Sequence, residues 1–414
     1  MKNKFLAFLG SAVLTAGVAN AGGYQANLQG QKQIGMGHAG TGLALDQSSI
    51  FFNPGALAHL RQNGIQLGVS ALNSRIAYRD PSQAPGISDA QTDNPLGTPF
   101  QVYASYGATE SPFRFGLGVY TPYGSSVNWG NTWQGRYALN ELTLQAIFIQ
   151  PTISYQITDK LGFGAGFVYA IGSVNLQRSI YIESRSTDED GRAELDGSAS
   201  GLGFNAGIYF QPTDKLSLGV TYRSKVDMEI KGGEADFTVP ASVEARVPDT
   251  NFDASLPLPA NITLGIGYKP SEKLTLAVDI QRVQWSAYKS LRFDYEEAVS
   301  GSTFTENARN YEDSYIFRLG AQYQLTNMLT LRAGAYYDQT PVQEGFLTPE
   351  TPDADSRGLS AGLTLALSNK IDLDASFLYL NKKERTDDAS KSGGVSGTYK
   401  SLAYIPGLGL SYKF

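Results

Sequence analysis

The sequence predicts an all-β protein, a 14-stranded antiparallel transmembrane β-barrel with an N-terminal plug, or hatch, inside its lumen. Three observations predict this fold. A short polar turn recurs along the chain, the segments between turns alternate apolar and polar residues, and an export signal precedes a chain that ends on an aromatic strand. Period-two alternation is typical of a strand with two unlike faces, and short turns opposite long loops are typical of outer-membrane barrels.

The recurring turn sets the number of strands. Its copies lie 42 to 58 residues apart, which is too wide for single sandwich strands and fits a hairpin plus one long loop. The copies are Tyr155–Leu161, Phe210–Leu216, Tyr268–Leu274, Tyr323–Leu329 and the shorter Leu367–Ile371. The first seven expected strands are 64–76, 97–108, 113–121, 138–156, 161–178, 197–213 and 216–231, and the second seven are 260–270, 274–295, 311–326, 329–342, 355–368, 370–386 and 398–414. The barrel domain therefore covers residues 63–414.

The two faces of each strand indicate where the barrel lies. Phe113, Phe115 and Leu117 alternate with Arg114 and Gly116, and other strands repeat the pattern. Fourteen strands enclose a lumen too wide for side chains to fill, so the apolar face must contact lipid. Aromatic residues at corresponding strand ends predict an interfacial girdle. These are Tyr106, Tyr155, Phe210, Tyr268, Tyr323 and Tyr412.

The first 21 residues have the parts of a secretory signal peptide. Lys2 and Lys4 supply positive charge, the apolar run 5–18 follows, and Ala19-Asn20-Ala21 offers small residues for cleavage. The apolar run is too short to span a bilayer as a helix, and an N-terminal core helix is the alternative. We expect residues 1–21 to be removed on the way to the bacterial outer membrane.

The composition excludes several functions. The 414 residues include no cysteine and two histidines, which excludes disulfides, cysteine-bound metals, thiol nucleophiles and multi-histidine metal sites. We therefore expect no cofactor and no metal site. The formal net charge is −6 without a basic stripe, so nucleic acid is not an expected partner. A mean hydropathy of −0.22 argues against a bundle of membrane helices.

Residues 22–62 do not alternate and are expected to form the plug. The segment is rich in glycine, and its apolar Ile50, Phe51, Phe52 and Leu57 favour packing over the alternative, a flexible periplasmic tail. Gly35–Gly40 matches the dinucleotide fingerprint GxGxxG, but the strand, helix and acidic residue that the fingerprint needs are missing. We interpret that match as accidental.

Seven motifs occur in one order along the mature chain. They are Phe51-Phe-Asn-Pro-Gly-Ala-Leu57, Thr121-Pro-Tyr-Gly124, Trp133–Tyr137, Trp285–Leu291, Tyr311–Gly320, Leu329–Pro341 and Pro352–Arg357. With them the chain resembles the FadL/TodX family of outer-membrane transporters of long-chain fatty acids and other hydrophobic compounds. The resemblance implies facilitated uptake by loop capture, a lumen pocket and lateral release through a kinked strand. Its partners would be those hydrophobic molecules, outer-membrane lipid and lipopolysaccharide.

The resemblance also implies site residues. In the plug, Asn53, Pro54 and Ala56 match the family's Asn-Pro-Ala, with Gly55 inserted here. Residues Thr121, Pro122, Tyr123 and Gly124 interrupt the third strand and would form the lateral gate, because proline cannot donate to a ladder. An ordinary transition from strand to loop is the alternative. Tyr24, near the mature N-terminus, would line the pocket.

Further ligand-binding candidates follow from the residues themselves. The 232–259 connection is predicted to be a loop whose apolar residues, among them Phe237 and Phe252, capture ligand, although a small core of its own is the alternative. A bound carboxylate needs a cation, and the candidates are Arg318 and Arg332 on the inner face and Arg178 near the expected pocket height. Pairing of these arginines with lumen Asp residues is the alternative.

Two other functions remain open at this point. An outer-membrane hydrolase of lipids or peptides would need a nucleophile with a base, but His38 and His59 both lie in the plug segment and no Ser–His–acid set is legible. We therefore expect that the protein is not an enzyme. A general porin would have an open lumen, whereas the plug predicts an occupied one.

Overall fold

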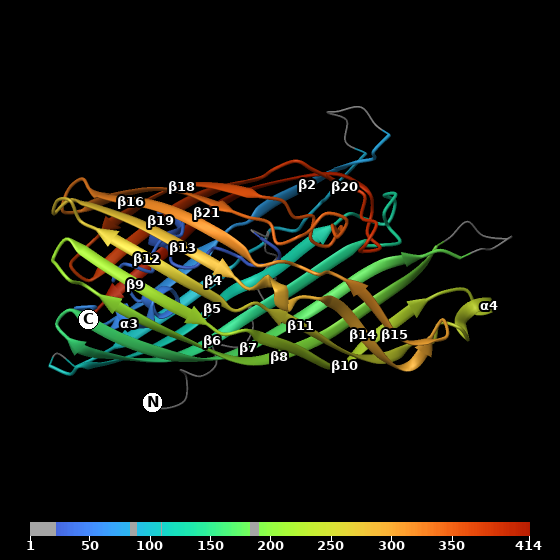
Figure 1. Cartoon of the computed structure of the whole chain (residues 1–414), viewed down its shortest axis with the longest axis horizontal. Helices are drawn as coiled ribbons and strands as arrows, with labels where there is room; N and C mark the ends of the chain where they lie inside the picture. The colour runs from blue at the N-terminus through green and yellow to red at the C-terminus, as the bar shows by residue number, and fades with distance from the viewer. Residues whose placement is uncertain (1–21, 83–88, 109, 183–189) are drawn as a thin grey trace, which may run out of the picture.

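The computed structural model describes residues 22–82, 89–108, 110–182 and 190–414, so the predicted signal peptide lies outside the described residues. The described strands form one closed antiparallel sheet (Figure 1). Strand β1 (Gly64–Ser70) pairs on one side with β4 (Phe100–Tyr106) and on the other with the C-terminal β21 (Gly397–Lys413), which closes the barrel. The chain crosses the wall fourteen times, as the turns predicted.

Seven crossings consist of two labelled strands each, and the other seven of one. The two-part crossings are β1 with β2 (Asn73–Arg79), β3 (Ala90–Gln91) with β4, β9 (Leu216–Arg223) with β10 (Val226–Thr238), β11 (Thr250–Leu258) with β12 (Asn261–Tyr268), β13 (Leu274–Val283) with β14 (Ser290–Val299), β15 (Ser302–Ala308) with β16 (Ser314–Gln324), and β19 (Ile371–Lys382) with β20 (Arg385–Asp387). The single strands are β5 (Phe113–Asn128), β6 (Glu141–Thr158), β7 (Leu161–Ile180), β8 (Gly191–Phe210), β17 (Leu329–Asp338), β18 (Ser356–Ala366) and β21.

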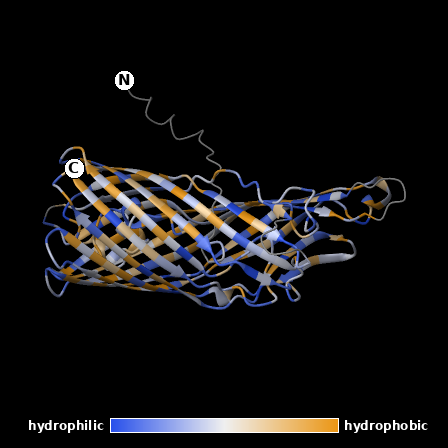
Figure 2. Cartoon of the chain, turned by 90° about the horizontal axis from the view of Figure 1, so that it is seen from above, coloured by the Kyte–Doolittle hydropathy of each residue, from blue (hydrophilic) through white to orange (hydrophobic). Residues whose placement is uncertain are grey.

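The outer face of the wall is apolar. Phe115 and Leu319 are 55% and 57% exposed, while Arg318, next to Leu319 on the inner face, is 4% exposed. The six aromatic residues of the predicted girdle are all exposed. Apolar residues band the half of the barrel that carries the C-terminus (Figure 2). No helix among the described residues has the length and apolar character needed to cross a bilayer.

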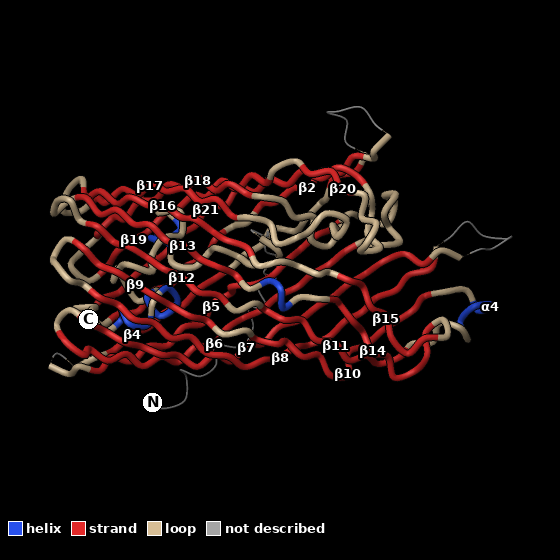
Figure 3. The backbone as a smooth tube through the Cα atoms, viewed as in Figure 1, coloured by secondary structure: helices blue, strands red, loops and turns tan. Residues whose placement is uncertain are grey.

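The two ends of the barrel differ, as expected. Short turns join the strands at the end that holds the C-terminus, and long loops gather at the other end (Figure 3). Strands β7 and β8 are 20 residues long. Since outer-membrane barrels have short periplasmic turns and long extracellular loops, the long-loop end is the extracellular one.

The prediction of a loop over residues 232–259 is wrong. Strands β10 and β11, joined through the short helix α4 (Ala241–Glu244), occupy most of this range. Phe237 and Phe252 are 9% and 1% exposed and belong to a small core with Phe293 and Tyr295. Because period-two alternation continues in this stretch, its apolar side chains are buried against neighbouring strands and do not form an exposed capture patch.

Residues 22–62 lie within the barrel and contact strands around it. They include α1 (Gln31–Ile34), α2 (Ser49–Phe52) and α3 (Pro54–Leu57). Buried Asp279 of β13 accepts hydrogen bonds from the backbone N–H groups of Gly40 and Thr41, at 2.9 and 3.0 Å. A Cβ on Gly334 of β17 would lie 2.0 Å from the nitrogen of Gly37, so glycine on the wall lets the two backbones touch.

The apolar belt predicts how charge is tolerated on the outer face. Leu319→Arg, in the middle of β16, should lower the free energy of unfolding by about 2–4 kcal/mol, because it places an arginine in hydrocarbon. Leu325→Arg, beside the short turn after β16 and 47% exposed, should lower it by no more than about 1 kcal/mol. Urea unfolding in lipid vesicles measures both. Equal losses for the two variants would contradict the position of the belt.

Candidate ligand cavity and strand break

An apolar cavity lies inside the extracellular half of the barrel, and its empty space, including the part open to solvent, is about 870 Å³. Its lining comes from β5 to β8, β10, β11, β14, the loops after β15 and β17, and the N-terminal segment. Among the lining side chains are Leu142, Ala146, Leu176, Met228, Ile230, Leu256, Leu258 and Phe293. The inward residues of several strands thus form one hydrophobic surface that no single stretch of sequence contains.

Tyr24 lines one side of this cavity. Its ring lies 4.9 Å from that of Trp285 and 5.8 Å from that of Tyr288, both edge-on, and its hydroxyl donates to the carbonyl oxygen of Pro257 at 2.5 Å. Gly23 has a φ of +63°, and a Cβ there would lie 2.6 Å from Trp285. A glycine is therefore needed directly before Tyr24.

One charged pair, Arg309 and Glu350, is part of the lining, and the sequence reasoning missed it. The Nη2 atom of Arg309 lies 3.5 Å from Oε1 of Glu350, and the two side chains are 4% and 16% exposed. Burial alone would lower the pKa of Arg309, but Tyr288 and Glu350 raise the pKa above its usual value, so the guanidinium stays charged.

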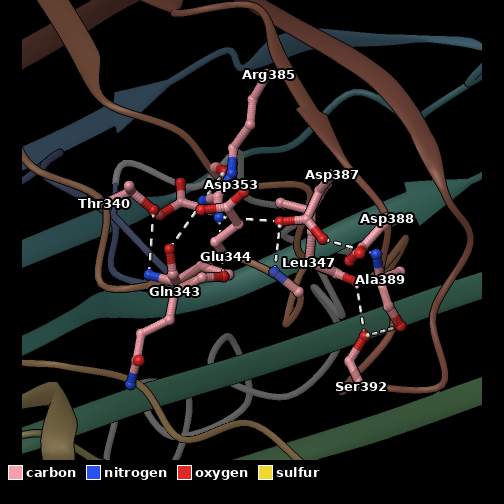
Figure 4. Close-up of polar contacts among 12 residues, drawn as sticks. Thr340, Gln343, Glu344, Leu347, Asp353, Arg385, Asp387, Asp388, Ala389 and Ser392 are labelled. Carbon is pink, nitrogen blue, oxygen red and sulfur yellow. Dashed lines mark hydrogen bonds and ion pairs between the residues drawn. The ribbon is translucent and has the colours of Figure 1, made fainter.

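Loop contacts fix the position of Glu350. Arg385 donates to the carbonyl oxygens of Val342 at 2.9 Å and Asp353 at 3.2 Å, on either side of Glu350 in the sequence. Arg385 and Asp387 converge on this loop in Figure 4. Next to Glu350, the hydroxyl of Thr351 lies 2.9 Å from that of Tyr311.

The predicted break in the third strand is a bulge in β5. Pairing with β6 shifts register between Tyr120 and Tyr123 and then continues to Asn128, whereas pairing with β4 ends at Tyr120. The N-terminal segment supplies the next partners. Gly124 N–H donates to the Tyr24 carbonyl at 3.0 Å, and Ala26 N–H donates to the Pro122 carbonyl at 2.8 Å.

The Gln29 amide adds a hydrogen bond to the Thr121 carbonyl at 3.0 Å, and Gln25 forms an antiparallel bridge with Tyr123. The backbone at this break therefore bonds to the lumen segment where a neighbouring strand of the wall would otherwise lie.

Asn53 connects the N-terminal segment to the wall. Its side chain accepts from Gly55 N–H at 2.9 Å, which caps α3, and donates to the carbonyls of Thr41 at 2.9 Å and Ile208 at 3.0 Å. Pro54 begins α3, where proline needs no N–H partner, and Ala56 is fully buried. A Cβ on the inserted Gly55 would lie 2.7 Å from the carbonyl of Gly207, so this departure from Asn-Pro-Ala leaves the backbone close to β8.

The other arginine candidates lie away from the cavity. Arg318 donates to Asn27 and Gln281 at 2.9 and 2.7 Å, and it is paired across the strands with Asp279. Arg332 lies 3.9 Å from Asp374. Arg178 is half-buried in β7 and does not line the cavity. Arg332 is therefore paired with an aspartate inside the lumen, and Arg318 lies opposite one, as the alternative for these arginines proposes.

A closed barrel with an apolar outer belt, an occupied lumen and an apolar cavity defines the class of outer-membrane transport barrels. The chain belongs to the family described as outer membrane protein transport protein (OMPP1/FadL/TodX), whose model matches residues 12–414. The family's named members are transport and outer-membrane proteins, which confirms the expected outer-membrane location and the expectation of a transporter over an enzyme.

Individual relatives agree with this membership. The 47 kDa outer membrane protein of Pasteurella multocida is 26% identical over 97% of this chain and 96% of its own. The long-chain fatty acid transport protein of Escherichia coli K12 is 21% identical over 87% of each chain. Among solved structures, a Pseudomonas aeruginosa FadL homologue has a TM-score of 0.83 at 20% identity, covering 95% of this chain and 100% of its own. The Pseudomonas putida toluene transporter TodX has a TM-score of 0.73 at 18% identity, covering 93% and 98%.

The contacts of Asn53 predict the effect of its removal. Asn53→Ala should loosen the attachment of the N-terminal segment by at least about 1 kcal/mol, because the cap of α3 and the hydrogen bonds to Thr41 and Ile208 are lost. Bursts of open current in planar bilayers should become roughly five times more frequent. Asn307→Ala, at an exposed site in β15, is the matched control. Equal currents in the two variants would contradict an anchoring role for Asn53.

Proposed function

We propose that the protein carries hydrophobic small molecules across the outer membrane by diffusion, through the apolar cavity and out through the break in β5. Tyr24 is the observation that carries this proposal, since its ring lines the cavity and its carbonyl accepts a hydrogen bond from Gly124 within the break. The cavity and the break therefore share one residue of the N-terminal segment, and a molecule in the cavity contacts the segment that occupies the break.

In this account residues 22–62 act as the plug. Their hydrogen bonds to Asp279 of β13, Gln150 of β6 and Ser376 of β19 attach the segment to distant parts of the wall. Such attachment supports a closed lumen and disfavours the general porin. Passage straight through the barrel would require breaking these bonds, whereas passage through the break requires moving only the residues near Tyr24.

The geometry around Ser125 supports a lateral route. Ser125 of β5 lines the main cavity and also a second cavity of about 390 Å³. The lining of the second cavity includes Ile76 of β2 and Leu402 and Ala403 of β21, beside the cations Arg75 and Lys382. In the proposed route an apolar molecule moves from the main cavity into this one and on to the wall, which avoids the cost of releasing it into water.

The ligands are apolar compounds with a chain or ring that fits the cavity. The relatives include proteins named for long-chain fatty acid transport, and the structural neighbours include toluene transporters. The apolar lining fits both classes. Outer-membrane lipid and lipopolysaccharide surround the barrel. Hydrolysis of lipids or peptides would need an activated nucleophile, and no observation at this cavity favours it.

Filling the cavity should strongly reduce transport. Ala146→Trp introduces an indole where Ala146 is 3% exposed and lines the cavity, so uptake of a radiolabelled hydrophobic compound should fall at least tenfold in whole cells. Leu202→Trp adds an indole to the lipid-facing side of β8, where Leu202 is 62% exposed, and should leave uptake within a factor of two. Unchanged uptake in Ala146→Trp would exclude the cavity from the route.

A reversible lock tests the break. The chain has no native cysteine, and Gln25 and Tyr123 are directly opposed in an antiparallel bridge, a geometry that accommodates a disulfide. In the variant Gln25→Cys/Tyr123→Cys, oxidation should stop uptake and reduction should restore it.

The matched control for the lock is Ala333→Cys/Ala361→Cys, which joins opposed residues of β17 and β18 elsewhere in the wall. Uptake by this control should not depend on redox state. If uptake by the oxidised lock stays normal, the N-terminal segment does not have to leave β5 for transport.

A further inference from the structure

The polar end of the cavity carries no net charge, and this bears on which molecules it accepts. Arg309 and Glu350 are the only charged residues among the described residues that line the cavity. Their charges cancel within the cavity, since Nη2 and Oε1 are 3.5 Å apart. A carboxylate ligand would therefore meet an arginine that already has an anionic partner.

The Glu350 carboxylate also has unused hydrogen-bonding capacity. Its Oε2 atom is buried and has no hydrogen-bond partner among the residues that the structure describes, although the side chain contacts the cavity. A buried acceptor without a donor is costly, and the cost falls when a ligand supplies an N–H or O–H group. A carboxylate supplies neither and would add like charge beside Oε2.

Glu350 is not free to withdraw in favour of an incoming anion. Its loop is held by the hydrogen bonds of Arg385 to the carbonyls of Val342 and Asp353, and by the contact of Thr351 with Tyr311. Arg309 is equally confined at 4% side-chain exposure and packs beside Tyr288. Displacing Glu350 from Arg309 would leave a buried carboxylate without its cation. That free-energy cost exceeds the gain from pairing Arg309 with the ligand's carboxylate.

We propose that this cavity selects uncharged amphiphiles, namely an apolar chain or ring that ends in a hydroxyl or amide donor, over fatty-acid anions of the same length. The donor binds Oε2 of Glu350 while the apolar part lies against the lining from β5 to β8, β10, β11 and β14. Arg309 serves to neutralise Glu350 and does not bind the ligand's head group. Glu350 is then the residue that determines specificity. This inference rests on the proposed function, because it assigns the ligand class of the same cavity.

The test compares three probes of equal chain length on the purified full-length mature protein in lipid nanodiscs. The probes are cis-9-octadecen-1-ol, methyl oleate and oleate at pH 8, each added as a competitor of radiolabelled cis-9-octadecen-1-ol. The wild-type protein should bind the alcohol at least tenfold more tightly than oleate, with the ester between them because it has no donor. In Glu350→Gln the pair loses its negative charge, so oleate should gain at least tenfold relative to the alcohol.

Glu344→Gln is the matched control, because Glu344 is an exposed carboxylate of the same loop that does not line the cavity. It should keep the wild-type order of affinities. Tighter binding of oleate than of the alcohol by the wild type would overturn the inference, and so would an unchanged ratio in Glu350→Gln. The wild-type comparison decides even if Glu350→Gln fails to assemble.

A different result would refute the proposed function itself. If Ala146→Trp binds the alcohol as tightly as the wild type, the probe binds outside the cavity. That outcome rejects the cavity as the transport site, whereas a wrong order of affinities in a competent cavity rejects only the assignment of Glu350.

Discussion

This structure depends on one constraint, which is that backbone N–H and C=O groups inside the hydrocarbon must find hydrogen-bond partners within the protein. Without water, each N–H and C=O of the wall needs a partner within the protein, so the sheet must close, and β1 pairs with β21 to do so. Closure over fourteen crossings leaves a wide lumen. Glycines on the inner face, such as Gly334, then allow the N-terminal segment to pack directly on the strand backbones.

The same constraint explains the relation between the segment and the break. Where β5 bulges away from β4, its backbone groups bond to Tyr24 and Ala26, so the wall remains satisfied only while the segment is in place. Movement of these residues would leave polar groups without partners beside the cavity. In the proposed route, a ligand that contacts Tyr24 would act on the wall through the peptide group of Tyr24, whose carbonyl bonds to Gly124.

Local patterns made the barrel predictable, whereas the site depends on distant contacts. Period-two alternation and the Thr/Ser turns depend on residues a few positions apart, so the crossings, the outer face and the C-terminal strand follow from the sequence. Alternation continues past residue 231 to the end of β10 at Thr238, which is why the loop predicted over 232–259 is wrong. Arg309 and Glu350 could not be paired from sequence because no local pattern joins two loops 41 residues apart. Tyr24 was predicted from the family resemblance, and its partners Trp285 and Tyr288 were not.

The central claim is that an apolar molecule occupies the cavity beside Tyr24. Anomalous diffraction from crystals grown with a long-chain alcohol brominated at its terminal carbon tests it most directly. The account predicts bromine density among Leu142, Met228 and Phe293, with the hydroxyl toward Glu350. Bromine density confined to the detergent belt, or to the polar space around His59 and Arg61 on the short-turn side, would contradict it.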